Sequence, residues 1–368
     1  MKEILGWLVT AEDPRQQGKV KHLMKDIIAI VFFAELANAS EWIEIYLFAR
    51  ANEKLLREHL ELPEGIPSHD TIQRVFAMIS PECLKEFRER WNEAMSGSAG
   101  DKLRKILALD GKTQRGNGSA GRKANHIVSA VDNNGFCIGE ELVDEKSNEI
   151  TAIPDLLKSL NINGHIVTAD AMGCQTEIAR QIRRQKADYM LGLKGNQGAL
   201  HEDVRQYFDD PKLLSGCAYH KVVDKARSAV ETREYWQTSD IGWLGQKGAW
   251  AGLASIVMTR NTIIKGDDRM TEARYFISSL PVNAEEAARA IRGHWMVESY
   301  HWHLDVTFRE DANHTLDKAA AYNLNIVKKM AINTLRLLDA GIAKVSMKNE
   351  RFLISMNFRH YLDKLLAL

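Results

Sequence analysis

The feature that most constrains this chain is a succession of short apolar runs, with helix-like segments between them, from residue 106 to residue 193. Five runs have the length and composition of buried strands: residues 106–110, 126–131, 136–143, 165–168 and 189–193. Helical spacing separates the last three, over residues 149–160 behind the capping residue Asn148 and over residues 176–186. The order of three strands, helix, strand, helix and strand predicts an α/β domain with a mixed sheet.

Residues 1–96 have a different hydrophobic pattern, because apolar residues recur there at helical spacing without strand-like runs. Ser68 predicts the start of one short helix, and Ser80-Pro81 predicts the start of the next. Two short helices across a tight turn suit either a pair that presents one helix to a DNA groove or a plain helical bundle. We therefore expect an all-helical N-terminal domain and regard it as a candidate for binding DNA ends.

The remaining domain limits follow from changes in composition. The small-residue segment 96–100 predicts a linker before the main α/β domain, which we place at residues 101–340. Short strand-like pieces predict a β-rich insertion at about 198–280 within that domain: residues 222–223, 231–235, 254–259 and 275–279. Eight basic and three acidic residues follow residue 322, so residues 341–368 are expected to form a basic C-terminal tail.

The composition indicates a cytoplasmic protein but does not identify its partner. The 368 residues include 49 basic and 49 acidic side chains, so a nucleic-acid partner would have to be recognised by local patches. Four separated cysteines show no paired metal or redox spacing and fit a reducing compartment. The longest apolar run, residues 27–34, is shorter than the ~20 residues that a membrane span needs. We expect a cytoplasmic protein with no membrane partner.

Three carboxylates stand out by their position in this pattern. Asp110 ends the first apolar run and Asp170 closely follows the fourth, and ligands of open α/β sheets gather at the carboxyl ends of strands. Glu298 lies three residues after Trp295 and four before Trp302, on the apolar face of an expected helix. The aspartates could instead be caps, and the glutamate an ion-pair partner. Together the three would suit two Mg²⁺ or Mn²⁺ ions and phosphodiester chemistry.

Other readings of the same region are weaker. His294 and Glu298 stand four residues apart and could share a zinc ion, but no complete metalloprotease signature surrounds them. Gly111-Lys112-Thr113 lacks the preceding glycine-rich loop of a phosphate-binding ATPase motif. Zinc hydrolysis and ATP hydrolysis are therefore poorly supported.

Basic and amide side chains flank the candidate carboxylates. Lys112 and Arg115 follow Asp110, and Lys194 and Asn196 end the last strand of the α/β pattern. On a solvated surface such residues carry no function, whereas beside acidic strand ends they suit contacts with phosphate. Binding of that kind would weaken steeply with salt.

The motifs along the chain resemble those of bacterial insertion-sequence transposases of the Asp-Asp-Glu (DDE) class, in the group that includes the H-repeat-associated proteins. The resemblance spans nearly the whole chain and keeps the order of the motifs. The matching stretches are GIPSHDTI at 65–72, LDGKT at 109–113, DEKSNEITAIP at 144–154, TADAMGCQ at 168–175, KGNQ at 194–197 and RGHWMVESYHWHLDV at 292–306.

The resemblance implies a ribonuclease-H-like catalytic domain in which Asp110, Asp170 and Glu298 hold two Mg²⁺ ions, with Mn²⁺ as a substitute. It implies cleavage of double-stranded DNA at the ends of an insertion element, followed by attack of the freed 3′-hydroxyl on target DNA. It also implies a homodimer or larger assembly on bacterial nucleoid DNA, because two ends must be held together. The expected DNA contacts are Lys112, Arg115, Lys194, Asn196, Arg292 and His294.

Two departures from related transposases leave alternatives open. A broader group carries Tyr, Arg, Glu and Lys around the last carboxylate, where this chain has Ile291, His294, Glu298 and Asp305, although the close group shares the His-Trp form. The insertion motif of the close group, His-Gly-Arg-x-Glu-x-Arg, reads RSAVETR at 227–233. A decayed or domesticated transposase that only binds DNA is one alternative, and a metal-dependent nuclease without strand transfer is the other.

Overall fold

The N-terminal part of the chain is helical, as expected. The computed structural model describes residues 13–95, 105–119, 121–144, 147–226, 229–338, 341–342 and 344–367, so the expected linker at 96–100 lies outside the described residues. Ser68 caps the fourth of the N-terminal α-helices by accepting a hydrogen bond from the Thr71 N–H. These helices are α2 (Met24–Leu36), α3 (Trp42–Ala51), α4 (Glu53–Leu56), α5 (His69–Met78) and α6 (Pro81–Met95), after the 3₁₀ turn η1 (Gln17–Lys19).

The described part of the main domain contains one mixed sheet of nine strands, in the order β3-β2-β1-β4-β5-β9-β8-β7-β6. Its strands are β1 (Ile106–Thr113), β2 (His126–Asp132), β3 (Cys137–Leu142), β4 (Ile166–Ala169), β5 (Asp188–Leu193), β6 (Ala218–Ala226), β7 (Ala229–Thr238), β8 (Ser255–Lys265) and β9 (Asp268–Ser278). Strands β1, β4 and β5 run parallel, and β2 and β3 are antiparallel to their neighbours. The expected α/β class with a ribonuclease-H-like mixed sheet is confirmed.

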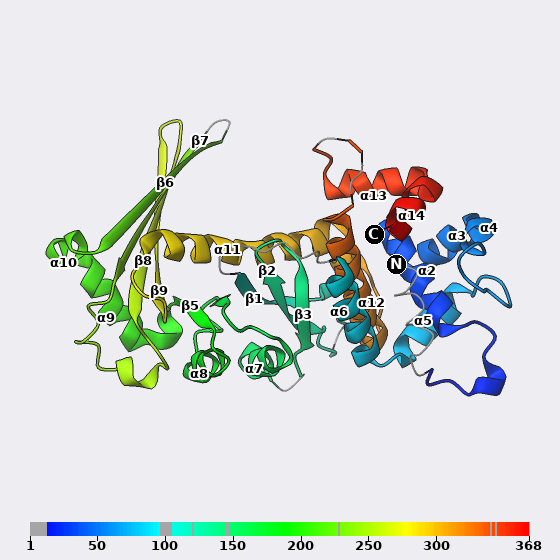
Figure 1. The fold of residues 1–368 in the computed structure, drawn as a ribbon, viewed down its shortest axis with the longest axis horizontal. Helices are drawn as coiled ribbons and strands as arrows, with labels where there is room; N and C mark the ends of the chain where they lie inside the picture. The colour runs from blue at the N-terminus through cyan, green and yellow to red at the C-terminus, as the bar shows by residue number, and fades with distance from the viewer. Residues whose placement is uncertain are drawn as a thin grey trace.

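Helices cover both faces of the parallel strands, because successive side chains of each strand point to opposite faces. Leu107 and Leu109 of β1 share a core with α7 (Glu149–Ser159) and α8 (Thr176–Arg184). Ile106 packs instead with the long helix α11 (Ala284–Trp302) on the other face. In Figure 1, α11 runs along one side of the sheet while α7 and α8 lie on the other.

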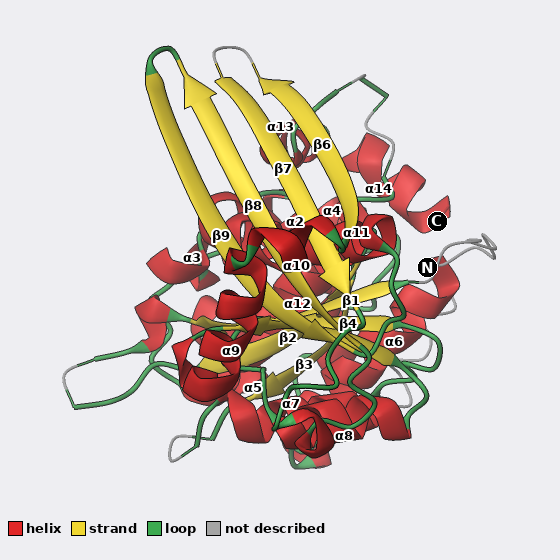
Figure 2. Cartoon of the chain, turned by 90° about the vertical axis from the view of Figure 1, so that its left-hand side faces the viewer, coloured by secondary structure: helices red, strands yellow, loops and turns green. Residues whose placement is uncertain are grey.

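The insertion is an arm made of four antiparallel strands, β6 to β9, preceded by α9 (Gly198–Asp209) and α10 (Pro211–Ser215). Figure 2 shows these strands rising steeply beyond the rest of the sheet. The strands are nine to eleven residues long, longer than the sequence predicts. Their outer halves carry charged and exposed side chains on both faces, so the hydrophobic pattern marks only the inner halves.

Helix α12 (Lys318–Leu335) belongs to the core of the N-terminal helices, although it follows α11 in the chain. It packs against α2, α5 and α6, and Figure 1 shows it beside α6, with α2 and α5 on the side away from the sheet. The segment expected as a basic tail folds into α13 (Met347–Met356) and α14 (Phe358–Ala367). Within it Arg351 is buried and bonds to the Glu35 carbonyl, so this part of the chain also closes the helical core.

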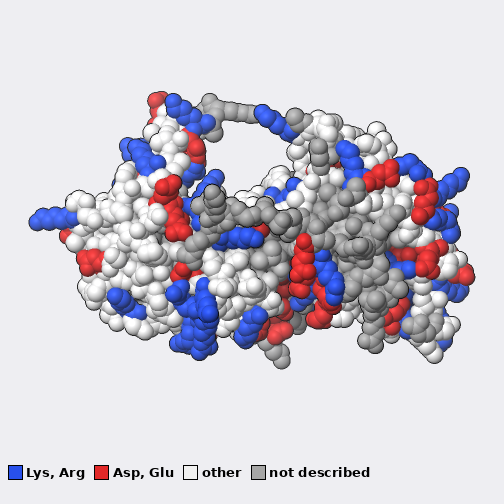
Figure 3. Space-filling view, viewed as in Figure 1, with Lys and Arg blue, Asp and Glu red and all other residues white. Residues whose placement is uncertain are grey.

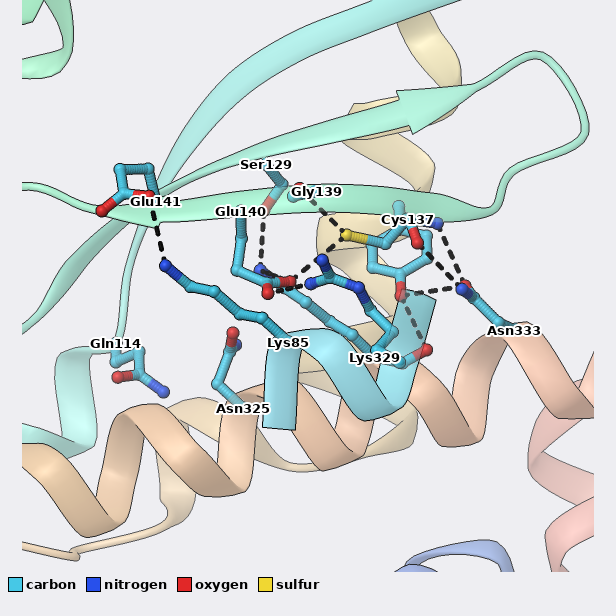
Figure 4. A network of polar contacts seen from close by, with 12 residues as sticks. Lys85, Gln114, Ser129, Cys137, Gly139, Glu140, Glu141, Asn325, Lys329 and Asn333 are labelled. Carbon is cyan, nitrogen blue, oxygen red and sulfur yellow. Dashed lines mark hydrogen bonds and ion pairs between the residues drawn. The ribbon is translucent and has the colours of Figure 1, made fainter. Parts of the chain in front are cut away.

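Buried polar contacts join the helical segment to the sheet. Arg88 of α6 forms a fully buried ion pair with Glu140 of β3, and Lys329 of α12 lies 3.5 Å from the same carboxylate. Lys329 also donates a hydrogen bond of 2.9 Å to the Ser129 hydroxyl on β2. Figure 4 shows Ser129, Glu140 and Lys329 converging between the helices and the strands. The helical segment and the sheet domain therefore share one interior.

Candidate active site

Asp110 and Asp170 lie side by side at the carboxyl ends of two parallel strands. The β1–β4 ladder pairs Leu109 with Ala169, so the next residue of each strand is one of the two aspartates. Residue Asp110 is still inside β1, while Asp170 begins the loop that follows β4. Because the strands are neighbours, the sheet brings together two carboxylates that are 60 positions apart in sequence.

The loop after Asp170 is fixed by short-range hydrogen bonds. One Asp170 carboxylate oxygen accepts the backbone N–H groups of Met172 (2.9 Å) and Gly173 (3.3 Å). The Asn196 amide donates to the Ala171 carbonyl at 2.6 Å, which ties this loop to the segment after β5. The Asp170 side chain is therefore held in place by the backbone that follows it.

Burial raises the pKa of Asp170, and the negative charges of Asp110 and Glu149 raise it further. The two backbone N–H bonds act in the opposite direction, because they favour the charged carboxylate. Carboxylates that repel one another in a half-buried site favour a bound cation, which would relieve the repulsion.

Glu298 lies on α11. One histidine before it and one after it in the sequence contact the sheet. His294 Nδ1 lies 3.1 Å from the Thr168 hydroxyl of β4, four residues before the glutamate. His301 Nδ1 lies 3.3 Å from Asp110 Oδ2, three residues after it. The pKa of His294 is lowered by burial, so its imidazole is neutral near pH 7.

The three carboxylates line one cavity of about 480 Å³ between the sheet edge, α11 and the inner part of the arm. Basic side chains line its other walls: Lys194, Arg233, Arg260, Arg274 and Arg292. The guanidinium of Arg292 lies over the Trp295 ring, 4.4 Å from its centroid, an arrangement that favours cation–π attraction. Figure 3 shows Lys and Arg side chains on the arm and on the floor of the hollow beside it.

The residues expected to contact DNA lie in different surroundings. Lys194 and Arg292 are exposed and line the cavity. Arg115 is 83% exposed, with Asp311 3.8 Å away, but does not line the cavity. The Asn196 amide donates a hydrogen bond to the loop after Asp170.

Lys112 is enclosed by three carboxylates and is 9% exposed. Its ammonium lies 2.6 Å from Asp305, 3.0 Å from Glu310 and 3.1 Å from Asp311. Burial acts to lower the pKa of Lys112, but the charge of Glu310 and the hydrogen bond with Asp305 outweigh it and raise the pKa. In the free protein this lysine therefore ties β1 to the segment after α11, and its charge is already neutralised.

The sequence did not single out three of the cavity arginines. Arg260 follows the predicted strand 254–259 directly and Arg274 directly precedes the predicted strand 275–279, so both fell just outside the expected elements. Arg233 is the last residue of the altered insertion motif and pairs with Asp224 and Glu231. The hydrophobic pattern marks only the inner halves of these strands, so it offered no signal for Arg260 and Arg274, whereas Arg233 lies within the predicted strand 231–235.

Oxygen donors dominate this end of the sheet, which fits the preference of Mg²⁺ and Mn²⁺. Asp110, Asp170 and Glu298 supply up to six carboxylate oxygens by their chemistry, and the charge of Asp110 acts to raise the pKa of Asp170. In the described part of the chain, no three His, Cys, Asp or Glu side chains already converge on a single point. The donor set fits divalent cations, and the three carboxylates would have to move closer together to bind one.

No helix among the described residues is both long and apolar enough to cross a membrane.

Comparison with known proteins agrees with this geometry. The family model described as "Transposase DDE domain" matches residues 101–334, and the model described as "DDE_Tnp_1-associated" matches residues 7–92. The chain is 36% identical to "Putative transposase YncI" of Escherichia coli O157:H7, over 100% of this chain and 95% of that protein. It is 34% identical to "H repeat-associated putative transposase YhhI" of Escherichia coli K12, over 100% and 98%.

The N-terminal match coincides with the helical segment, and the second match ends within α12. The DDE domain model covers more than half of the chain, including all three carboxylates of the cavity. The chain belongs to the DDE transposase family, among relatives that include the H repeat-associated transposases.

Proposed function

We propose that the protein is an active DNA transposase that cuts double-stranded DNA at the ends of its element and joins them to target DNA. The observation that carries the proposal is the cavity in which Asp110, Asp170 and Glu298 face a wall of basic side chains. A phosphodiester needs both features, because the acidic side holds the catalytic cations and the basic side holds the phosphates.

In this proposal Asp110, Asp170 and Glu298 would hold two Mg²⁺ or Mn²⁺ ions. When bound, the two ions would activate a water or a 3′-hydroxyl and stabilise the leaving oxygen. His294 and His301 keep α11 at the distance from the sheet that Glu298 needs. Lys194 and Arg292 contact the phosphates of the strand in the cavity, because they are exposed and line it.

Two element ends have to be cut and joined in one event, so we propose a homodimer or larger assembly on DNA. Lys112 and Arg115, which lie away from the cavity, are left for contact with the flanking duplex. A contact through Lys112 would require rearrangement of the Asp305, Glu310 and Asp311 cluster.

The test uses the purified full chain with DNA that contains the flanks of its own gene, in Mg²⁺ or Mn²⁺. Asp170→Asn removes a cavity carboxylate while preserving side-chain size, and we expect it to abolish cleavage while DNA binding is retained. Asp132→Asn is the matched control, because Asp132 ends β2 beside Leu107, at the opposite end of β1 from Asp110. Defined cuts at both flanks with wild type and Asp132→Asn, and none with Asp170→Asn, are the expected result.

A second assay with precut ends measures strand transfer. Joining of precut ends to a plasmid separates a transposase from a nuclease that only nicks DNA. Specific binding without any metal-dependent cleavage by the wild type would overturn the proposal and identify a DNA-binding relic. Cleavage by Asp170→Asn at the wild-type rate would remove that residue from the catalytic site.

A further inference from the structure

Glu149 is a fourth carboxylate at the catalytic end of the sheet, and it has no place in the mechanism given above. It is the first residue of α7, between β3 and β4 in the chain. Its side chain is 11% exposed, and its carboxylate lies 2.7 Å from His126 Nε2. The position is well defined, because His126 Nδ1 lies 2.8 Å from the Thr113 hydroxyl at the end of β1.

The contacts around this carboxylate engage one of its two oxygens. His126 Nε2 lies 2.7 Å from Glu149 Oε1, and the Thr113 hydroxyl lies 2.8 Å from His126 Nδ1 on the other side of the ring. A carboxylate has two oxygens, each able to accept further hydrogen bonds or to bind a divalent cation. The pair with His126 therefore fixes the position of Glu149 without using all of its binding capacity.

Gly111 makes the approach of Glu149 to the catalytic strand possible. A Cβ atom at residue 111 would lie 2.1 Å from Glu149 Oε1 and 2.6 Å from His126 Nε2. The carboxylate therefore occupies the space that any side chain next to Asp110 would fill. The glycine directly after the catalytic aspartate forms a cradle for a second acidic group at the same strand end.

A purely structural role explains these features less well. Helix α7 is already capped by the Asn148 side chain, which accepts the Ile150 N–H. Glu177 shows the ordinary first-turn glutamate in this fold, because on the next helix it is 57% exposed and pairs with Arg180. Only Glu149 is turned inward against the catalytic strand in this comparison.

We propose that Glu149 is a fourth acidic ligand of the catalytic centre, which helps Asp110 and Asp170 to hold a divalent cation. This inference rests on the proposed function, because it assumes that the aspartate pair binds metal. In the metal-free protein, His126 holds the carboxylate beside Gly111. Glu149 would add a carboxylate from the α7 face of the sheet, whereas Glu298 lies on α11 at the opposite face.

Mn²⁺ binding to the full chain without DNA tests the proposal, with bound and free Mn²⁺ counted by electron paramagnetic resonance. Glu149→Gln keeps the size of the side chain and can still bond to His126. We expect it to weaken Mn²⁺ binding roughly ten- to a hundredfold, with the Tm of the metal-free protein nearly unchanged. Glu177→Gln is the matched first-turn control and should bind Mn²⁺ as the wild type does.

A second variant separates metal binding from structural support. His126→Gln loosens the anchor but keeps the Glu149 carboxylate, so we expect Mn²⁺ affinity within a few-fold of wild type. Equal loss in Glu149→Gln and His126→Gln would show that the pair only supports the fold, which overturns the proposal. Wild-type affinity in Glu149→Gln would overturn it as well.

The reference variant Asp110→Asn distinguishes the two levels of the argument. If Asp110→Asn loses Mn²⁺ binding and Glu149→Gln does not, the fourth ligand is refuted and the proposed function stands. If Asp110→Asn binds Mn²⁺ as tightly as wild type, the metal site of the proposed function is itself refuted, and the fourth ligand with it.

Discussion

The buried ion pair between Arg88 and Glu140 gives a sharp test of the shared interior. Both side chains are at most 1% exposed, and the pair joins α6 to β3. Arg88→Met keeps the aliphatic bulk but leaves the Glu140 carboxylate without its guanidinium. Breaking a buried pair by removing one partner costs about 3–5 kcal/mol. Lys329 still lies 3.5 Å from the carboxylate, so we expect the lower end, about 3 kcal/mol.

This cost converts into a measurable shift. Unfolding entropy of about 2.1 cal/mol/K per residue gives roughly 0.8 kcal/mol/K for a chain of 368 residues that unfolds in one transition. A loss of about 3 kcal/mol then lowers the Tm by about 4 °C. The assay is thermal unfolding followed by far-ultraviolet circular dichroism and by tryptophan fluorescence, whose transitions should move together because the two parts share a core.

The matched control lies two residues away on the same helix. Arg90 pairs with Glu86 at 2.9 Å, but both side chains are about half exposed. Exposed pairs of this kind contribute about 0.3–0.5 kcal/mol, so Arg90→Met should move the Tm by less than about 1 °C. Equal shifts in Arg88→Met and Arg90→Met would refute the reasoning, and so would separate transitions for the two optical signals.

Two further predictions concern Lys329 and Thr168. Burial lowers the pKa of Lys329 from 10.5 to about 8, so between pH 8 and 10.5 the unfolded chain binds the extra proton, and this residue's contribution to stability rises with pH by roughly 3 kcal/mol. In urea unfolding, the free energy of unfolding of the wild type should therefore rise relative to that of Lys329→Met over that pH range. The same pH dependence in both proteins would contradict the lowered pKa of Lys329. Thr168→Val removes the hydroxyl that contacts His294. Loss of a hydrogen bond of about 1 kcal/mol predicts that DNA cleavage slows about fivefold while the Tm changes little. An unchanged cleavage rate would show that the contact of His294 does not position α11.

The end of the sheet that carries Asp110 and Asp170 could be predicted well because local pattern and chemistry agree there. Asn148 marked the start of α7, and the apolar run before Asp110 marked β1, both as the structure has them. Strand ends in an α/β sheet bring their carboxyl ends together, so two of the three cavity carboxylates followed from order alone. Their roles as metal ligands remain predictions.

The place of α12 could not be predicted from the pattern. Its buried face includes Asn323, Asn325, Lys328 and Lys329, which a hydrophobicity pattern assigns to solvent. Each donates a hydrogen bond to a group outside the helix, as when the Asn323 amide donates to the Phe76 and Ile79 carbonyls at the turn between α5 and α6. Burial of polar groups depends on such partners, and a single sequence does not reveal them.

Glu149 was hidden for a related reason. In sequence it reads as an ordinary acidic residue in the first turn of a helix, where the helix dipole favours it. Only the approach of α7 to β1 brings its carboxylate against Gly111, the residue after Asp110. The cavity arginines of the arm were missed because both faces of its outer strands are polar, which removes the alternation that reveals a strand.

The shared core ties the timing of folding to protein synthesis. The N-terminal helices end at Met95, but α12, which completes their core, ends at Leu335. At roughly 5–20 residues per second, a ribosome takes on the order of 12–50 s to make the intervening 240 residues (335 − 95). During that interval the apolar faces of α2, α5 and α6 lack their partner. A prematurely terminated product is therefore expected to be a target for chaperones and proteases instead of a stable DNA-binding fragment.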